Sequence, residues 1–332
     1  ADILGIEADA VVVVGRLWQE TRLPRQAIQA VVFHPPADPH ARDELFFRAL
    51  AKDRRDERVL LENGDELAGH MPEMVRRDAG AFQLTRITWT ASDGNQAVDV
   101  PLDRLIAVLL APNTVQVPPT GGHETLVGLR DGSLIRVQAM QRNVRSLEFQ
   151  LVAGPRIATE PSATPEGEPW QAVVMLQPLR AQVAYLSDLQ PLGYRYIPFL
   201  EATWPFQPDR SVSGGRLRHA GHVWAKGLGM HSSSRLAYET RGQYQALHAE
   251  VAIDDRAGRQ GSVIFRVYIQ DAADNWSMAY ESAVVRGGEP AVPVRVDLRQ
   301  AVRLALIVDY ADRADQWDHA NWLNARLVGN DE

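Results

Sequence analysis

Acidic residues follow a regular spacing near the C-terminus of the sequence. Aspartates recur every three residues, at Asp309, Asp312, Asp315 and Asp318. Ca²⁺ takes about six to eight oxygen ligands, which carboxylates and free carbonyl groups in one loop can supply. The stretch lacks the glycine and the terminal glutamate of an EF-hand. It therefore predicts a calcium site of another kind. The alternative is a solvated acidic loop that Arg313 partly neutralises.

Tryptophan and tyrosine concentrate in the second half of the chain. Sugar rings stack their C–H faces on aromatic side chains, and their hydroxyls need polar partners. The run Asp274-Asn275-Trp276 combines both kinds of group in a turn between two expected strands, and Tyr280 follows shortly after it. These residues are the predicted sugar-binding contacts. For any single tryptophan, burial in the core is the alternative.

Signatures of catalysis are missing. The sequence has no Gly-x-Ser-x-Gly elbow, phosphate-binding glycine-rich loop, His-Glu-x-x-His or dinucleotide fingerprint. It also has no cysteine, which excludes thiol nucleophiles, disulfides and thiolate metal sites. The paired carboxylates of a glycosidase come from distant strands, so spacing does not test for them, and no segment points to them. We therefore expect a protein that is not an enzyme.

Net charge and the length of apolar runs limit the possible binding partners, and chain length limits the number of domains. The net charge of −7 argues against binding nucleic acid by neutralising phosphates. No apolar run is long enough to cross a bilayer, so no membrane insertion is expected. A length of 332 residues predicts two or three domains.

Short runs rich in Val, Ile, Leu and Thr alternate with turn residues, which indicates an all-β protein. Periodicity favours a helix only over Asp43–Lys52. Expected strands lie at Ala10–Gly15, Arg58–Leu61, Phe82–Thr90, Leu126–Leu129 and Val263–Ile269.

The first half of the chain has the pattern of an internal repeat. Pro24, Pro101 and Pro178 stand at equal intervals, and each precedes a similar apolar run. Leu61–Leu67 also resembles Leu129–Ile135, each with a central Asn-Gly or Asp-Gly hairpin signal. Each unit is typical of a small SH3-like or Sm-like barrel. The first unit lacks its hairpin, so we expect the sequence to begin partway through it.

These patterns predict five regions. They are the end of a first barrel repeat (1–33), a linker with a short helix (34–56), a second repeat (57–110), a third repeat with a Pro-rich loop at 158–169 (123–186), and a C-terminal module (187–332).

Four runs of the C-terminal module follow a shared pattern. They are Trp224–Ser234, which contains Lys-Gly-Leu-Gly-Met-His, then Ala249–Asp255, Gly261–Val267 and Asp318–Leu327, which begins Asp-His-Ala-Asn-Trp. Through these runs, residues 191–329 resemble the NPCBM family of carbohydrate-binding modules. The first run is similar to the family's lysine-glycine-leucine-glycine-x-histidine run, the last to its closing aspartate-histidine-alanine-aspartate-tryptophan signature, and the other two to strands between them. This chain has Asn321 where the family usually has aspartate, and an amide oxygen can still ligate calcium.

The resemblance implies a galactose-binding-like jelly-roll β-sandwich, of a type whose related modules carry a structural calcium and bind galactose-type sugars. We place His231 of the glycine-rich run in the predicted sugar site. The alternatives are that His231 and His319 are core histidines and that Gly227 and Gly229 serve only the backbone conformation.

The predicted function is non-catalytic binding of a galactose-type glycan at loops of the C-terminal jelly roll, in an exported bacterial protein. One alternative is a structural or protein-interaction role in an envelope assembly, with protein partners bound through the N-terminal repeats. Another is an accessory region of a larger glycoside hydrolase.

Overall fold

The computed structural model forms two compact units, Ala1–Leu179 and Arg180–Glu332. It describes residues 2–7, 9–15, 19–51, 55–70, 86–91, 97–111, 123–159, 169–180, 183–198, 203–312 and 314–329. The boundary between the units precedes the expected one at 187, because Val183–Tyr185 pairs with a strand of the C-terminal unit. Strands dominate both units, so the all-β fold class is confirmed.

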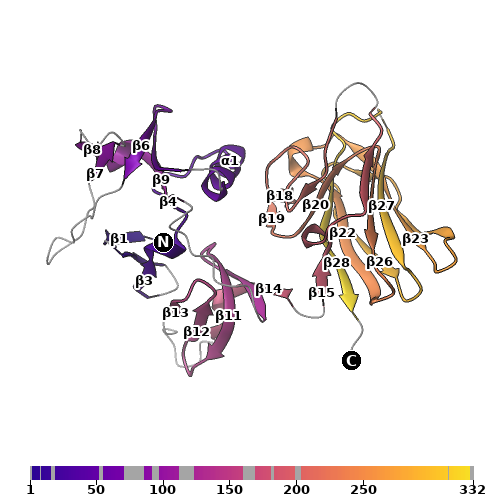
Figure 1. Ribbon diagram of the computed structural model, residues 1–332, viewed down its shortest axis with the longest axis horizontal. Coiled ribbons are helices and arrows are strands. Elements are labelled where there is room, and N and C mark those ends of the chain that lie inside the picture. The colour runs from indigo at the N-terminus through magenta and orange to yellow at the C-terminus, as the bar shows by residue number, and fades with distance from the viewer. Residues whose placement is uncertain are drawn as a thin grey trace. The chain divides into compact units, whose positions relative to one another are not determined.

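The described strands of the N-terminal unit form three sheets (Figure 1). The first contains β1 (Asp2–Ile6), β2 (Ala10–Val14) and β3 (Thr21–Pro24). The second has the order β4 (Ala30–Val32), β9 (Leu105–Leu109), β5 (Glu57–Leu61), β6 (Glu66–His70), β7 (Arg86–Ala91) and β8 (Ala97–Pro101). The third has the order β13 (Arg156–Ala158), β12 (Leu147–Leu151), β11 (Leu134–Arg142), β10 (Glu124–Leu129) and β14 (Val173–Arg180).

The two predicted hairpin turns share one geometry. Gly64 and Gly132 have φ values of 89° and 87°, a left-handed conformation that glycine adopts without steric cost. The side chains of Asn63 and Asp131 each accept a hydrogen bond from the backbone N–H two residues later. Pro24 and Pro101 each precede a short 3₁₀ turn, whereas Pro178 lies inside β14. Repetition of the whole unit stays a prediction.

The helix of this unit, α1 (Pro39–Leu50), starts earlier than the expected Asp43–Lys52. Asp38 caps it by accepting a hydrogen bond from the N–H of Ala41, and Pro39 occupies the first turn. Proline is favoured there because its missing N–H has no partner within the helix. The helix of the predicted linker region 34–56 therefore begins at Pro39.

The C-terminal unit is a sandwich of two antiparallel sheets (Figure 1). Sheet I has the order β17 (Gln207–Pro208), β20 (Gly227–His231), β28 (His319–Gly329), β22 (Tyr244–Ile253) and β26 (Val292–Asp297), and β15 (Val183–Tyr185) also pairs with β28. Sheet II has the order β16 (Gly193–Tyr196), β21 (Ser234–Glu239), β27 (Arg303–Tyr310), β23 (Ser262–Gln270) and β24 (Trp276–Glu281), and β25 (Val285–Arg286) also pairs with β23. A separate hairpin joins β18 (Leu217–His219) to β19 (His222–Trp224).

Alternate residues of these strands fill the space between the sheets. Phe265 of sheet II meets Trp322 of sheet I edge to face, with ring centroids 5.1 Å apart. Leu236, Leu247 and Leu306 are fully buried in the same cluster. This alternation turns the other face of each strand outward.

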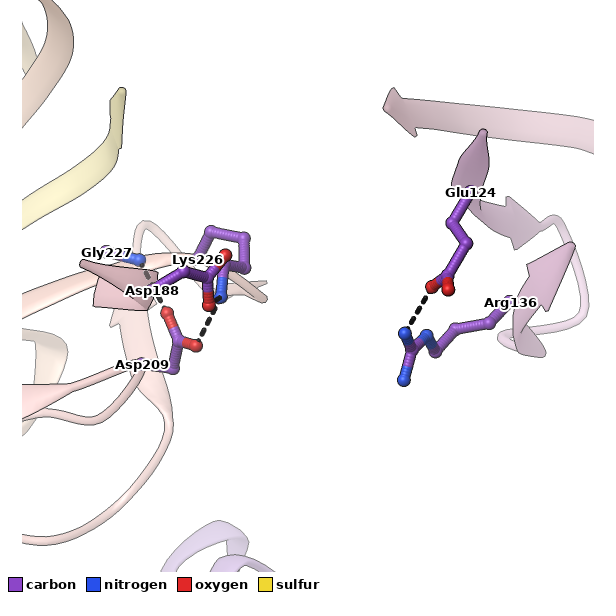
Figure 2. Close-up of polar contacts among 6 residues, drawn as sticks. All are labelled: Glu124, Arg136, Asp188, Asp209, Lys226 and Gly227. Atoms are coloured by element: carbon purple, nitrogen blue, oxygen red, sulfur yellow. Dashed lines mark hydrogen bonds and ion pairs between the residues drawn. The ribbon is translucent and has the colours of Figure 1, made fainter. Parts of the chain in front are cut away.

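Lys226 forms ion pairs with two aspartates from separate segments of the C-terminal unit (Figure 2). Its Nζ lies 2.6 Å from carboxylate oxygens of both Asp188 and Asp209, and Asp209 also accepts a hydrogen bond from the N–H of Gly227. Figure 2 also shows an ion pair of the N-terminal unit, between Glu124 of β10 and Arg136 of β11.

None of the helices in the described part of the chain has the length and apolar character that a membrane-spanning helix needs.

Candidate functional site

Aromatic and histidine side chains gather at one end of the sandwich. The ring of Trp204 stacks on His231 at a centroid distance of 4.8 Å and an interplanar angle of 5°. His319 lies 5.7 Å from Trp204 and 6.0 Å from His231, again between ring centroids. The three rings form one cluster at the paired ends of β20 and β28.

Tyr196 and Trp317 lie next to this cluster of rings and extend it. The hydroxyl of Tyr196 lies 3.5 Å from Nδ1 of His231, and the ring of Trp317 lies 5.6 Å from His319. His231 and His319 are 3% and 6% exposed, whereas Trp317 is 44% exposed. The exposed indole of Trp317 therefore lies beside the buried imidazole of His319. We call Tyr196, Trp204, His231, Trp317 and His319 the aromatic site.

Strand pairing places the two histidines. His231 is the last residue of β20 and His319 the first of β28, and they are register partners. Tyr196 ends β16 on sheet II. Trp317 belongs to the turn before β28, and its carbonyl oxygen lies 2.2 Å from the position that a Cβ on Gly261 would take. Only a glycine at 261 lets this turn approach β23 so closely.

Burial keeps both imidazoles neutral. Desolvation lowers the pKa of His319 to about 4, helped by the neighbouring His231 and by Arg256. Desolvation also lowers the pKa of His231, against the opposing effects of the Ser232 carbonyl and of Asp315. Nδ1 of His231 lies 2.7 Å from that carbonyl, which only accepts hydrogen bonds, so Nδ1 carries the proton and Nε2 is an acceptor.

Asp315 and Asp318 act on the site in different ways. Asp318 is fully buried, and its carboxylate accepts hydrogen bonds from the Ser232 hydroxyl and the Ser262 N–H. Burial raises the pKa of Asp318 to about 6, and the nearby Asp315 adds to the effect. The pKa of Tyr196 is also raised, first by burial and then by Asp315 and Asp318.

The predicted calcium ligands have separate contacts. Asp309 pairs with Arg266, and Asp312 pairs with Arg286. Within the described part of the chain, no group of three or more His, Cys, Asp or Glu residues is arranged to hold a metal ion. The structure thus does not gather Asp309, Asp312, Asp315 and Asp318 around one point, and calcium binding by this stretch stays a prediction.

The predicted sugar-binding residues do not lie together in the structure. Asp274 and Asn275 lie in the turn between β23 and β24, where Asp271 accepts hydrogen bonds from the N–H groups of Ala273 and Asn275, and Trp276 is the first residue of β24. Trp276 is 46% exposed, whereas Tyr280 is half-buried against the core. Trp276 pairs with Gln270 at one end of β23, and Ser262 contacts Asp318 at the other. The nine residues of β23 separate these ends by about 26 Å, so His231 is remote from the other predicted contacts.

The C-terminal unit is similar to known protein domains. Residues 182–328 match the NPCBM/NEW2 domain family. A curated protein named "Putative endo-alpha-N-acetylgalactosaminidase", from Renibacterium salmoninarum, is 32% identical over 153 residues, which are 43% of this chain. The chain spans 9% of the length of that relative.

Solved structures of carbohydrate-binding modules are similar as well. The CBM51 module of a Clostridium perfringens GH95 protein, in complex with methyl-galactose, is 23% identical and covers 44% of this chain and 99% of that one, with a TM-score of 0.38. The CBM51-2 and INT domains of C. perfringens ZmpB, in complex with GlcNAc, are 20% identical and cover 75% and 45% of the two chains, with a TM-score of 0.39. The NPCBM match confirms the resemblance seen in the sequence and supports a carbohydrate-binding role.

Within the C-terminal unit, the sequence pointed to one of the five residues of the aromatic site, His231. Tyr196, Trp204 and Trp317 belong to no signature run, and His319 was treated as a core residue. The available signal was that both terminal signature runs contain a histidine. Antiparallel pairing of those two runs brings the histidines together.

The contribution of His319 to the stability of the C-terminal unit should rise with pH between about 4 and 6.5. The unfolded chain protonates His319 near its ordinary pKa of 6.5, whereas the folded chain keeps it neutral down to about 4. Unfolding therefore takes up a proton in this window, and stability increases as the pH rises through it. Asp318 acts in the opposite direction, because its raised pKa makes stability fall as the pH rises towards 6.

The His319→Gln variant isolates the histidine contribution. Thermal unfolding at pH 4.5 and 7.5, followed by tryptophan fluorescence, should show a smaller pH-dependent gain in the variant than in the wild type, by up to about 3 kcal/mol. Parallel pH profiles for the two proteins would contradict the burial of a neutral His319.

Proposed function

We propose that the C-terminal unit binds a neutral, galactose-type sugar at the aromatic site and performs no catalysis there. The stacked Trp204 and His231 rings beside the exposed Trp317 are the observation that carries this proposal. Flat indole faces suit the C–H face of a pyranose ring and exclude water from it. The NPCBM match supports the same class of ligand.

Polar groups around the rings suit sugar hydroxyls. Nε2 of His231 is the acceptor nitrogen of its buried ring, and the Asp315 carboxylate lies close enough to influence His231 and Tyr196. Nδ1 of His319 is buried and has no hydrogen-bond partner among the described residues. Because both imidazoles stay neutral, the site offers hydrogen bonds without a fixed positive charge.

One named relative supports a proposal about the wider role of the chain. We propose that the chain is the carbohydrate-binding part of a larger exported glycoside hydrolase, because the relative with 32% identity carries the name of one. The N-terminal sheets would then be a spacer beside the sugar-binding unit. Calcium binding by the acidic stretch remains a separate prediction, which a chelator arm in each binding experiment tests.

Two exposed tryptophans at opposite ends of the sandwich provide a matched test. Trp317 and Trp276 are 44% and 46% exposed, so their replacement by alanine removes similar surface. We expect the full-length Trp317→Ala variant to bind galactose-terminated glycans at least tenfold more weakly. Trp276→Ala should stay within twofold of the wild type. Titration calorimetry measures both, in the affinity range of about millimolar to micromolar.

The alternative outcomes are distinct. Loss of binding in Trp276→Ala alone would move the site to the predicted Asp274–Trp276 turn. A folded wild-type protein that binds no glycan on an array, with calcium or with chelator, would overturn the proposal. That result would favour the structural or protein-interaction role.

A further inference from the structure

Two arginines face each other on the outer surface of sheet II. Arg195 of β16 and Arg235 of β21 are register partners, and both are exposed. The same row continues through Ile307 of β27 to Arg266 of β23. Side chains directly opposite each other on paired strands have Cβ atoms about 5 Å apart. The two guanidinium groups can therefore reach one common point.

The acidic groups on this face have other partners. Arg266 binds both Asp309 and Glu281, and Glu239 pairs with Arg241. Neither Arg195 nor Arg235 has a hydrogen bond or ion pair to any residue that the structure describes. Like charges directly opposite on a sheet are destabilising, so an anion held between the two would remove a cost that the free protein bears. The planar, forked guanidinium suits carboxylate and sulfate oxygens.

This pair borders the aromatic site. Tyr196, which lies against His231, directly follows Arg195, and Ser234, its register partner, directly precedes Arg235. Successive side chains of a strand point to opposite faces and are about 3.3 Å apart along it. A glycan leaving the aromatic site over the end of β16 therefore passes the arginines. Asp315 makes the aromatic site itself unsuited to an acidic ring.

We infer that the preferred ligand is an acidic glycan. A neutral ring occupies the aromatic site, and a carboxylate or sulfate on the neighbouring part of the glycan lies between Arg195 and Arg235. This inference rests on the proposed function, because it takes the aromatic site as the place where the neutral ring binds. It adds a charge preference that neither the family match nor the relatives specify.

Titration calorimetry of the full chain with lactose, 3′-sialyllactose and 3′-sulfolactose tests this preference. We expect the acidic ligands to bind about three- to tenfold more tightly than lactose at low salt, with most of the advantage lost at high salt. The carboxylate and sulfate arms identify which oxyanion the arginines select. The double variant Arg195→Gln/Arg235→Gln should abolish the advantage and keep lactose affinity within twofold. Arg295→Gln, an exposed arginine on sheet I, is the control that should preserve it.

A second measurement separates this inference from the proposed function. Sodium sulfate should raise the melting temperature of the wild type more than that of the double variant, relative to sodium chloride of equal ionic strength. Lactose binding without any preference for acidic ligands would overturn the inference and leave the proposed function standing. Failure of all three ligands, with the sulfate effect retained, would overturn the proposed function and leave the anion site.

Discussion

Gly229→Ala is expected to destabilise the C-terminal unit by at least about 3 kcal/mol, because the new methyl group has no space. A Cβ at Gly229 would lie 2.3 Å from the carbonyl oxygen of Arg210 and 2.4 Å from the backbone nitrogen of Val212. Both are main-chain atoms, so no side-chain rotation relieves the contacts. The strand around Gly229 is also fixed, since Leu228 and Met230 are completely buried. Urea denaturation of the full chain, followed by tryptophan fluorescence, measures the loss.

Gly193→Ala is the matched control for this prediction. Gly193 also lies in a strand, β16, and an added Cβ there meets nothing within 4 Å. Its backbone does not require glycine, so we expect a change within about 0.5 kcal/mol. Equal midpoints for the Gly229→Ala and wild-type proteins would contradict the close approach of residues 210–212 to β20.

The glycine-rich signature run is therefore largely explained by the backbone. Gly227 has a φ of 152°, and its Cβ would lie 2.4 Å from the carbonyl oxygen of Trp322. Both glycines let neighbouring main chain pack directly on β20. That packing sets the position of His231 at the end of the strand. The run thus encodes the fold and, through it, one residue of the aromatic site.

Local patterns predicted the strands better than the site. The Asn-Gly and Asp-Gly turns and the expected Val263–Ile269 strand depend on neighbouring residues, and all three are present. The aromatic site instead joins segments from Tyr196 to His319 that pair only in the folded chain. The acidic spacing could not predict the ion pairs of this stretch for a similar reason, because Arg266 and Arg286, which pair with Asp309 and Asp312, lie far away in the sequence. Such partners have no signal in the local spacing.

Asn321→Asp is expected to destabilise the C-terminal unit by about 3–5 kcal/mol at pH 7.5. Nδ2 of Asn321 donates to Oδ2 of Asp254 at 2.8 Å, and both residues are buried. The substitution replaces this donor by a second carboxylate. Oδ1 of Asn321 accepts no hydrogen bond from any described residue, so no donor is in place to compensate the new charge. The family's usual aspartate is therefore unfavourable with the partners that this chain provides.

The loss of stability in the Asn321→Asp variant should increase with pH. Burial already raises the pKa of Asp254, and a second carboxylate would raise the pKa of the pair further. The folded variant would then hold a proton that the unfolded chain releases, so its stability falls as the pH rises from about 4 to 7.5. Urea denaturation at pH 4.5 and 7.5 should show a larger deficit for the variant at the higher pH. A deficit that is equal at both values would contradict the charge explanation.

Exchanging the two groups tests whether charge alone matters. The double variant Asp254→Asn/Asn321→Asp again pairs one amide with one carboxylate, so it should be more stable at pH 7.5 than Asn321→Asp. Recovery should stay incomplete, because Asp254 also accepts hydrogen bonds from the N–H groups of Arg218 and Arg256. The two donors bind different oxygens of Asp254, and an asparagine has only one, which leaves a partly buried N–H unpaired at a cost of about 1 kcal/mol. Full recovery would mean that the backbone contacts of Asp254 contribute nothing. No recovery would mean that they, rather than the repulsion between carboxylates, determine the stability of this end of β28.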